Sequence, residues 1–131
     1  MSKLHSSSLF ILVVLLSFAG CKKTEKAREE ARQATLTDEQ VVQAIEDYIA
    51  GNLAADSTFA VEDTLENRTR RLKLDYVHTS VHRTDDGKYY VCADMTEGAQ
   101  KLDLDFYVVV EDTTPKVSEV VIHKVDNVSR K

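Results

Sequence analysis

Four long stretches rich in β-branched and aromatic residues follow one another in this chain, and the connections between them are too short to hold a helix. These stretches, together with a shorter one before them, span residues 58–61, 72–81, 89–95, 102–110 and 117–125. Turn-forming residues lie in the three gaps, with Gly87 in the first, Gly98 in the second and Pro115 in the third. Because short connections pair neighbouring strands antiparallel, the sequence predicts a four- to five-stranded antiparallel meander sheet.

One amphipathic helix precedes the predicted sheet. Thr37 and Gln40 have the spacing of a capping box, and Leu36 and Val41 occupy the positions of a hydrophobic staple. Apolar residues then recur at helical spacing as far as Gly51, a typical helix terminator. A helix with one apolar stripe needs a sheet to cover it. We therefore expect a single α+β domain over residues 36–131, with an N-terminal helix packed on the sheet, and this element order resembles the cystatin-like roll.

Alternation along the strands predicts which side chains meet the helix. In residues 102–110, Leu104 and Phe106 share one parity, and Asp105 and Tyr107 share the other. Near Tyr76 the apolar residues change from even-numbered to odd-numbered positions, which predicts a β-bulge at that point. One face of the sheet should therefore pack against the helix, and the other should be polar and open.

The predicted open face brings together several residue types that bind metals. The outward residues are His78, Tyr90, Cys92, Asp94, Asp103, Asp105 and His123. Imidazole, thiolate and carboxylate groups suit zinc or copper. We therefore consider a metal or small-ligand site built from His78, Asp103, Asp105 and His123. The alternative is a solvated polar face on which Cys92 is a small, largely buried residue without a chemical role.

Apolar residues on the same face predict a different role. Tyr90, Tyr107 and Val109 point outward in the predicted alternation. Such residues favour contact with a partner, here another protein of the cell envelope or a peptide. This non-catalytic binding or assembly role is our first hypothesis, and metal or small-ligand binding is the alternative.

No catalytic residue is predicted. Cys92 lies in the middle of a strand, and the nearby carboxylate of Asp94 should raise its pKa, whereas reactive thiolates need an electropositive setting. The motifs of phosphate, dinucleotide, metalloprotease and serine-hydrolase sites do not occur. We therefore expect neither an enzyme nor a bound cofactor.

The first 21 residues have the pattern of an export signal. Lys3 supplies a positive charge, residues 9–16 are an unbroken apolar run, and small residues precede Cys21. The apolar run is too short to span a bilayer. The segment SFAGC resembles the lipobox of bacterial lipoproteins, although Phe18 stands where Leu is more usual. The resemblance implies a signal peptide over residues 1–20 and a lipidated Cys21 that holds the protein on a lipid bilayer.

Residues after the predicted signal peptide also fit a cell-envelope lipoprotein. Residues 21–35 combine the lipidated cysteine with a charged stretch that has no large apolar side chain, so we expect a tether. Lys22 follows the cysteine where Asp would signal inner-membrane retention, so the resemblance implies the outer membrane, facing the periplasm. The segments DYVH, KYYVCADM, LDLDFYV and VVIHKV loosely resemble small uncharacterised envelope lipoproteins.

The charge of the chain argues against one class of partner. Lys and Arg total 17 and Asp and Glu total 22, which gives a net charge of -5 and a pI near 5.3. Proteins that bind nucleic acid neutralise phosphates with basic patches. We therefore expect no nucleic-acid partner.

Overall fold

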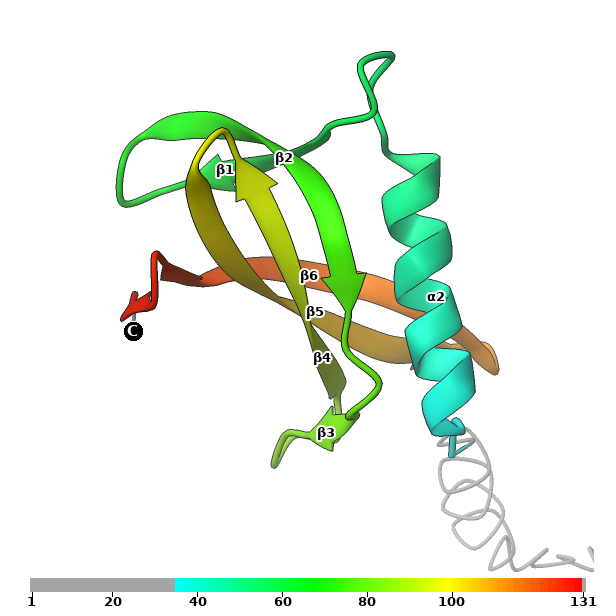
Figure 1. The fold of residues 1–131 in the computed structure, drawn as a ribbon. Coiled ribbons are helices and arrows are strands. Elements are labelled where there is room, and N and C mark those ends of the chain that lie inside the picture. The colour runs from blue at the N-terminus through cyan, green and yellow to red at the C-terminus, as the bar shows by residue number, and fades with distance from the viewer. Residues whose placement is uncertain (1–34, 131) are drawn as a thin grey trace, which may run out of the picture.

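The computed structural model describes residues 35–130 and shows an α+β fold with one helix and one curled antiparallel sheet (Figure 1). The predicted signal peptide, Cys21 and nearly all of the tether lie outside the described residues. Within residues 35–130, no helix is both long enough and apolar enough to cross a bilayer.

The sheet has more strands than the sequence predicts. Its elements are β1 (Phe59–Asp63), β2 (Arg68–Val77), β3 (His82–Arg83), β4 (Tyr89–Glu97), β5 (Gln100–Glu111), β6 (Thr114–Val125) and β7 (Val128–Ser129). They pair in the order β1-β2-β4-β5-β6-β7, and β3 pairs with β4. The prediction of four to five strands is corrected to seven, because β3 and β7 are two residues long and too short to show alternation.

The helix α2 (Asp38–Gly51) lies within the chain and not at its N-terminus, which corrects the predicted position. Its predicted capping box is present: the Thr37 hydroxyl accepts from the Gln40 amide, and the Gln40 side chain accepts from the Thr37 amide. Val41, Ile45 and Ile49 are its buried residues and lie at helical spacing. This stripe fixes which face of α2 packs on the sheet.

The core lies between α2 and the inner face of the sheet. Alternation in β4 and β5 is as predicted, and the buried inward residues are Tyr89, Val91, Ala93, Met95, Leu102, Leu104, Phe106 and Val108. Tyr48 of α2, Phe59 and Phe106 pack with ring centroids 5.9 to 6.4 Å apart. The buried apolar residues of the described chain lie between Leu36 and Val125, so this part contains the core it needs to fold.

Strand β2 contains the predicted bulge. Leu74 pairs with Met95 and Tyr76 pairs with Asp94, so Asp75 is the extra residue. The bulge reverses parity, so that both Leu72 before it and Val77 after it face the core. The predicted strand over residues 72–81 is corrected at both ends, because β2 begins at Arg68 and ends at Val77.

The hairpin between β5 and β6 is tighter than predicted. Only Asp112 and Thr113 form the turn, both with positive φ as a two-residue hairpin loop requires. Pro115 therefore lies in β6, opposite Val110 of β5. A proline is tolerated there because the other edge of this part of β6 has no strand partner among the described residues.

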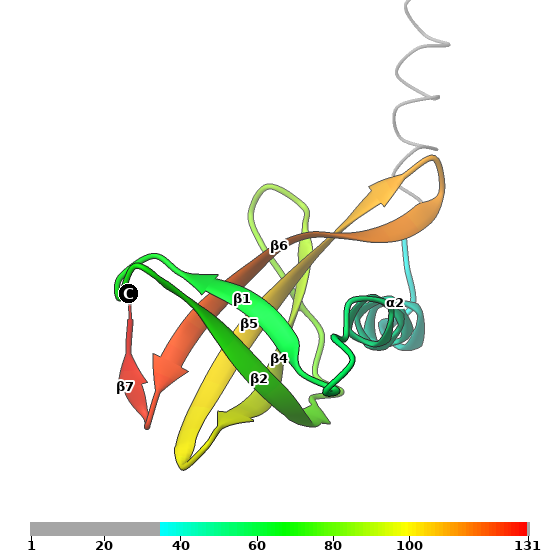
Figure 2. The same ribbon diagram turned by 90° about the horizontal axis from the view of Figure 1, so that it is seen from above.

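The two ends of the curled sheet come close to each other on the side away from α2. Figure 2 shows the β1–β2 connection and the C-terminal end of the described chain on that side. Here the inner face means the side of the sheet that carries the core, and the outer face means the opposite side. These two faces position all the side chains discussed below.

Candidate functional site

A cysteine, an aspartate and a histidine meet on the outer face of the sheet. Cys92 of β4 lies directly opposite Asp105 of β5, and His123 comes from β6. One ligand atom from each side chain lies within 4.8 Å of the other two. We call these three residues the outer cluster.

A second β-bulge places the histidine. Asp103 pairs with Lys124 and Leu104 pairs with Ile122, so His123 is the extra residue of β6. Bulges re-aim side chains and are over-represented beside functional sites. This local irregularity, which the sequence of residues 117–125 did not reveal, turns the imidazole toward Asp105.

The thiol of Cys92 and the imidazole of His123 are both within hydrogen-bonding distance of the Asp105 carboxylate. The Cys92 thiol donates to Asp105 Oδ1 at 2.9 Å. His123 Nδ1 lies 3.3 Å from Oδ1 and 3.1 Å from Oδ2 of the same carboxylate. Asp105 is 0% exposed, although it points away from the core as the alternation predicts. The prediction of an open polar face is therefore corrected at this residue, since its neighbours cover it.

The thiol of the outer cluster is held protonated. Burial raises the pKa of Cys92 from 9.0 to about 12, and the hydrogen bond and charge of Asp105 act in the same direction. The charges of Asp103 and Asp94 add to the effect. At neutral pH the group is therefore a hydrogen-bond donor and not a thiolate nucleophile.

The other two predicted metal ligands lie elsewhere on the outer face. His78 follows the end of β2, and its Nε2 lies 2.9 Å from Asp94 Oδ1. Asp103 faces Lys124, with its Oδ2 3.6 Å from Nζ. The structure thus brings together Asp105 and His123 but not His78 and Asp103. Cys92, which the sequence placed on this face, completes the group.

The predicted partner-binding residues form part of a row of rings. The Tyr90 ring stacks on His82 at a centroid distance of 5.0 Å and tilts against Tyr107 at 5.5 Å. Tyr90 and Tyr107 are half-buried, as is Val109, which follows Tyr107 at the same parity. We call His82, Tyr90, Tyr107 and Val109 the aromatic row, and it crosses β3, β4 and β5.

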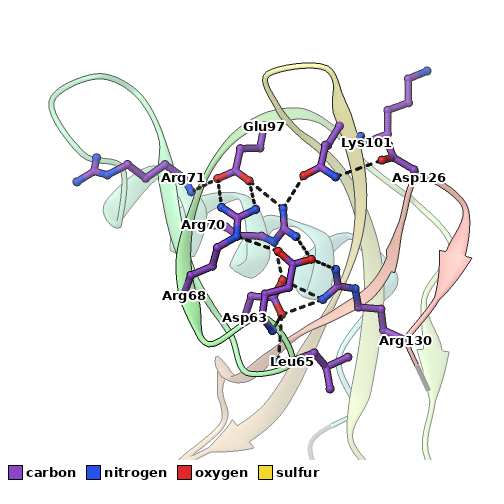
Figure 3. Close-up of polar contacts among 11 residues, drawn as sticks. Asp63, Leu65, Arg68, Arg70, Arg71, Glu97, Lys101, Asp126 and Arg130 are labelled. Atoms are coloured by element: carbon purple, nitrogen blue, oxygen red, sulfur yellow. Dashed lines mark hydrogen bonds and ion pairs between the residues drawn. The ribbon is translucent and has the colours of Figure 1, made fainter.

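A third group, which sequence reasoning missed, lies where the two ends of the sheet approach each other (Figure 3). Arg70 of β2 is 0% exposed and faces inward with Leu72. Its Nε lies 2.6 Å from Asp63, its Nη1 lies 2.8 Å from Glu97, and its Nη2 lies 2.8 Å from Glu66. The alternation of Arg70 with Leu72 was the available signal, but the predicted strand began too late to include it.

Two further arginines complete this charged network. Arg130, after β7, contacts both oxygens of Asp63 at 2.8 and 2.9 Å, and Glu66 at 2.6 Å. Arg68 contacts Glu66 at 2.9 Å and Glu97 at 2.8 Å. We call these six residues the arginine network. Its three cations and three anions balance, and the Arg130 contacts join the C-terminal end of the described chain to β1.

The acids of the arginine network stay ionised. Burial raises the pKa of Asp63, but the hydrogen bond from Arg70 and the charge of Arg130 outweigh it and hold the pKa below its usual value. Burial likewise raises the pKa of Glu97, but hydrogen bonds from the Arg71 backbone N–H and the Arg68 side chain outweigh burial and lower that pKa below its usual value. This group therefore stabilises the fold and has no dissociable proton near neutral pH.

Comparison of this chain with protein families, with curated proteins and with solved structures finds no significant match. The role of the protein has therefore to be inferred from its own residues.

Proposed function

We propose that the protein is a cell-envelope lipoprotein whose folded domain is a non-catalytic binding or assembly module. In this proposal Cys21 is the lipidated residue, residues 22–35 form the tether, and the domain faces the periplasm from the outer membrane. The support for the anchor is the sequence pattern that ends at Cys21 and the charged run CKKTEK that begins there.

The aromatic row is the observation that carries the binding role. Tyr90, Tyr107 and Val109 leave apolar surface half-exposed on the neighbouring strands β4 and β5. Tyrosine is enriched at protein interfaces because it offers a large contact area and loses little conformational entropy. The fitting partner is another envelope protein that presents an apolar patch to this row.

The chemistry of the outer face supports a non-catalytic role. The Cys92 thiol has a pKa of about 12, so it does not supply a nucleophile at neutral pH. The element order, one helix followed by antiparallel strands, supports the likeness to the cystatin-like roll. That likeness concerns the fold and carries no activity with it.

A site-specific photo-crosslink tests the binding role. A photoreactive phenylalanine analogue replaces Tyr107 in cells that make the protein, and the same analogue replaces the exposed helix residue Glu46 as a control. We expect a discrete cross-linked envelope protein from position 107 only, and its loss when Tyr90→Ala is added. Equal patterns from both positions would contradict the proposal.

Membrane fractionation tests the anchor separately. Cys21→Ser removes the only side chain that the lipobox pattern would lipidate. We expect the variant to leave the membrane fraction under a high-salt wash, because a single uncleaved apolar run of this length does not span a bilayer. If the variant stays in the membrane fraction at the level of the parent protein, the lipoprotein assignment is wrong. This result would leave the proposed binding role unaffected.

A further inference from the structure

We propose that Cys92, Asp105 and His123 form a zinc site on the outer face of the sheet. The three residues come from three adjacent strands, β4, β5 and β6, so the backbone pairing holds them in place. This inference is independent of the partner-binding role. It rests on the identity, spacing and burial of the three ligands.

The nitrogen and oxygen ligands already have the separation that tetrahedral zinc requires. Zinc binds histidine nitrogen and carboxylate oxygen at about 2.0–2.2 Å, so the two atoms should lie about 3.3 Å apart around the ion. His123 Nδ1 lies 3.1 and 3.3 Å from the Asp105 oxygens. The Cys92 sulfur is 2.9 Å from Oδ1 and has to move outward to about 3.6 Å, since a Zn–S bond is about 2.3 Å long.

The charge of the ligand set matches a divalent ion. When zinc binds, the Cys92 thiol proton passes to solvent, and the proton on His123 Nδ1 that faces Asp105 is exchanged through solvent for one on Nε2, so that Nδ1 is free to bind the ion. Thiolate and carboxylate then carry two negative charges against the two positive charges of zinc. A neutral complex suits a carboxylate that is 0% exposed, because an uncompensated charge is costly at a buried position.

The mixture of ligands selects among metals. Calcium and magnesium take oxygen ligands, so a thiol beside the carboxylate disfavours both. Copper(I) prefers thiolate and thioether ligands to a carboxylate. One sulfur, one nitrogen and one oxygen, with room for a fourth ligand, is a set that zinc accepts.

The fourth position faces outward. The His123 side chain is 27% exposed and Cys92 is half-buried, whereas Asp105 is 0% exposed, so solvent reaches the cluster from the side of the imidazole and the thiol. Tyr90 and Tyr107 lie two residues from Cys92 and Asp105 on the same face. Water, or a donor atom from a molecule held on the aromatic row, is placed to complete the coordination.

The competing explanation is that the three residues only satisfy each other by hydrogen bonding, and cobalt spectroscopy separates the two. The full chain with Cys21→Ser, purified in detergent, contains Cys92 as its one thiol. Cobalt(II) is added, and then zinc. We expect a thiolate-to-cobalt charge-transfer band in the near ultraviolet, intense visible bands of tetrahedral cobalt, and displacement of cobalt by one equivalent of zinc.

Single substitutions of each residue assign the ligands. Cys92→Ser should abolish the charge-transfer band, and Asp105→Asn and His123→Ala should each weaken zinc binding more than about 100-fold, the upper end of what losing even an outer-shell partner costs. His78→Ala is the matched control, because His78 also pairs with an aspartate on this face, and it should bind zinc like the parent. Absence of the charge-transfer band in the parent, or zinc affinity that survives both Cys92→Ser and His123→Ala, would overturn the proposal.

Discussion

The arginine network and the outer cluster each surround a buried carboxylate, but the groups that contact the carboxylate differ between them. Asp63 is 3% exposed and contacts the guanidinium groups of Arg70 and Arg130, which are permanently charged. Asp105 is 0% exposed and contacts a thiol and an imidazole, both of which can lose a proton. A carboxylate held by fixed cations is a structural element, whereas one held by proton-bearing metal ligands can exchange those protons for an ion.

Removal of the central cation should have the largest effect. Arg70→Met keeps most of the side-chain volume but leaves Asp63 and its neighbours without their central guanidinium. We expect a loss of about 3–5 kcal/mol in the free energy of unfolding, measured by urea denaturation.

Arg71→Met is the matched control for this substitution. Arg71 is the next residue of β2, its side chain is exposed, and its guanidinium lies 3.4 Å from the Asp56 carboxylate. The expected change is within about 0.5 kcal/mol. If the two variants unfold at the same urea concentration, the arginine network does not stabilise the fold as described.

The two buried carboxylates should respond differently to amide replacement. Asp63→Asn leaves Arg70 and Arg130 with one negative charge fewer, and we expect a loss of about 3 kcal/mol. Asp105→Asn keeps a hydrogen-bond acceptor for the Cys92 thiol, and in the absence of metal we expect a loss of about 1 kcal/mol. Urea denaturation in the presence of a chelator measures both, and a reversed order would remove the distinction between the regions.

The sequence predicted the outer cluster better than the arginine network, for physical reasons. Strand parity places Cys92 and Asp105 on one face, and it does so without knowledge of pairing. It does not give register, so His78 and His123 could not be ranked before the bulge at His123 was seen.

The arginine network depends on contacts that span the chain. Arg130 meets Asp63 across 67 positions, and no local pattern of residues signals such a pairing. The sequence-based strand also began after Arg70, so an inward-facing arginine was not considered. By contrast the capping box of α2 involves residues three apart, and it was correctly predicted.

Acid should weaken the arginine network in a defined pH range. The pKa values of Asp63 and Glu97 are lowered in the folded state from their ordinary values of 3.8 and 4.5. Groups of this kind contribute stability that is complete above the ordinary pKa and is lost as pH falls through the lowered one. We expect the stability difference between the parent and Asp63→Asn to be constant near neutral pH and to shrink below about pH 4. A difference that grows on acidification would contradict the assignment.

Alkylation of Cys92 should be slow in the folded chain. A thiol with a pKa of about 12 contains little thiolate at pH 8, so in the Cys21→Ser chain it should react with iodoacetamide at least about 100-fold more slowly than the same thiol in urea. Asp105→Asn removes a hydrogen bond and a charge that raise this pKa, and should speed the reaction. Equal alkylation rates in the folded and unfolded chain would show that the fold does not raise the pKa of Cys92.

Thermal unfolding of the full Cys21→Ser chain with zinc or with EDTA, alongside His123→Ala and His78→Ala, tests most directly whether the outer cluster binds metal. A ligand at 100 times its Kd stabilises the folded state by about 2.7 kcal/mol, which for a domain of this size raises Tm by roughly 10 °C. We predict that zinc raises the Tm of the parent and of His78→Ala but not of His123→Ala. A Tm that zinc leaves unchanged in the parent, or that it raises equally in His123→Ala, would contradict the proposed difference between the two regions.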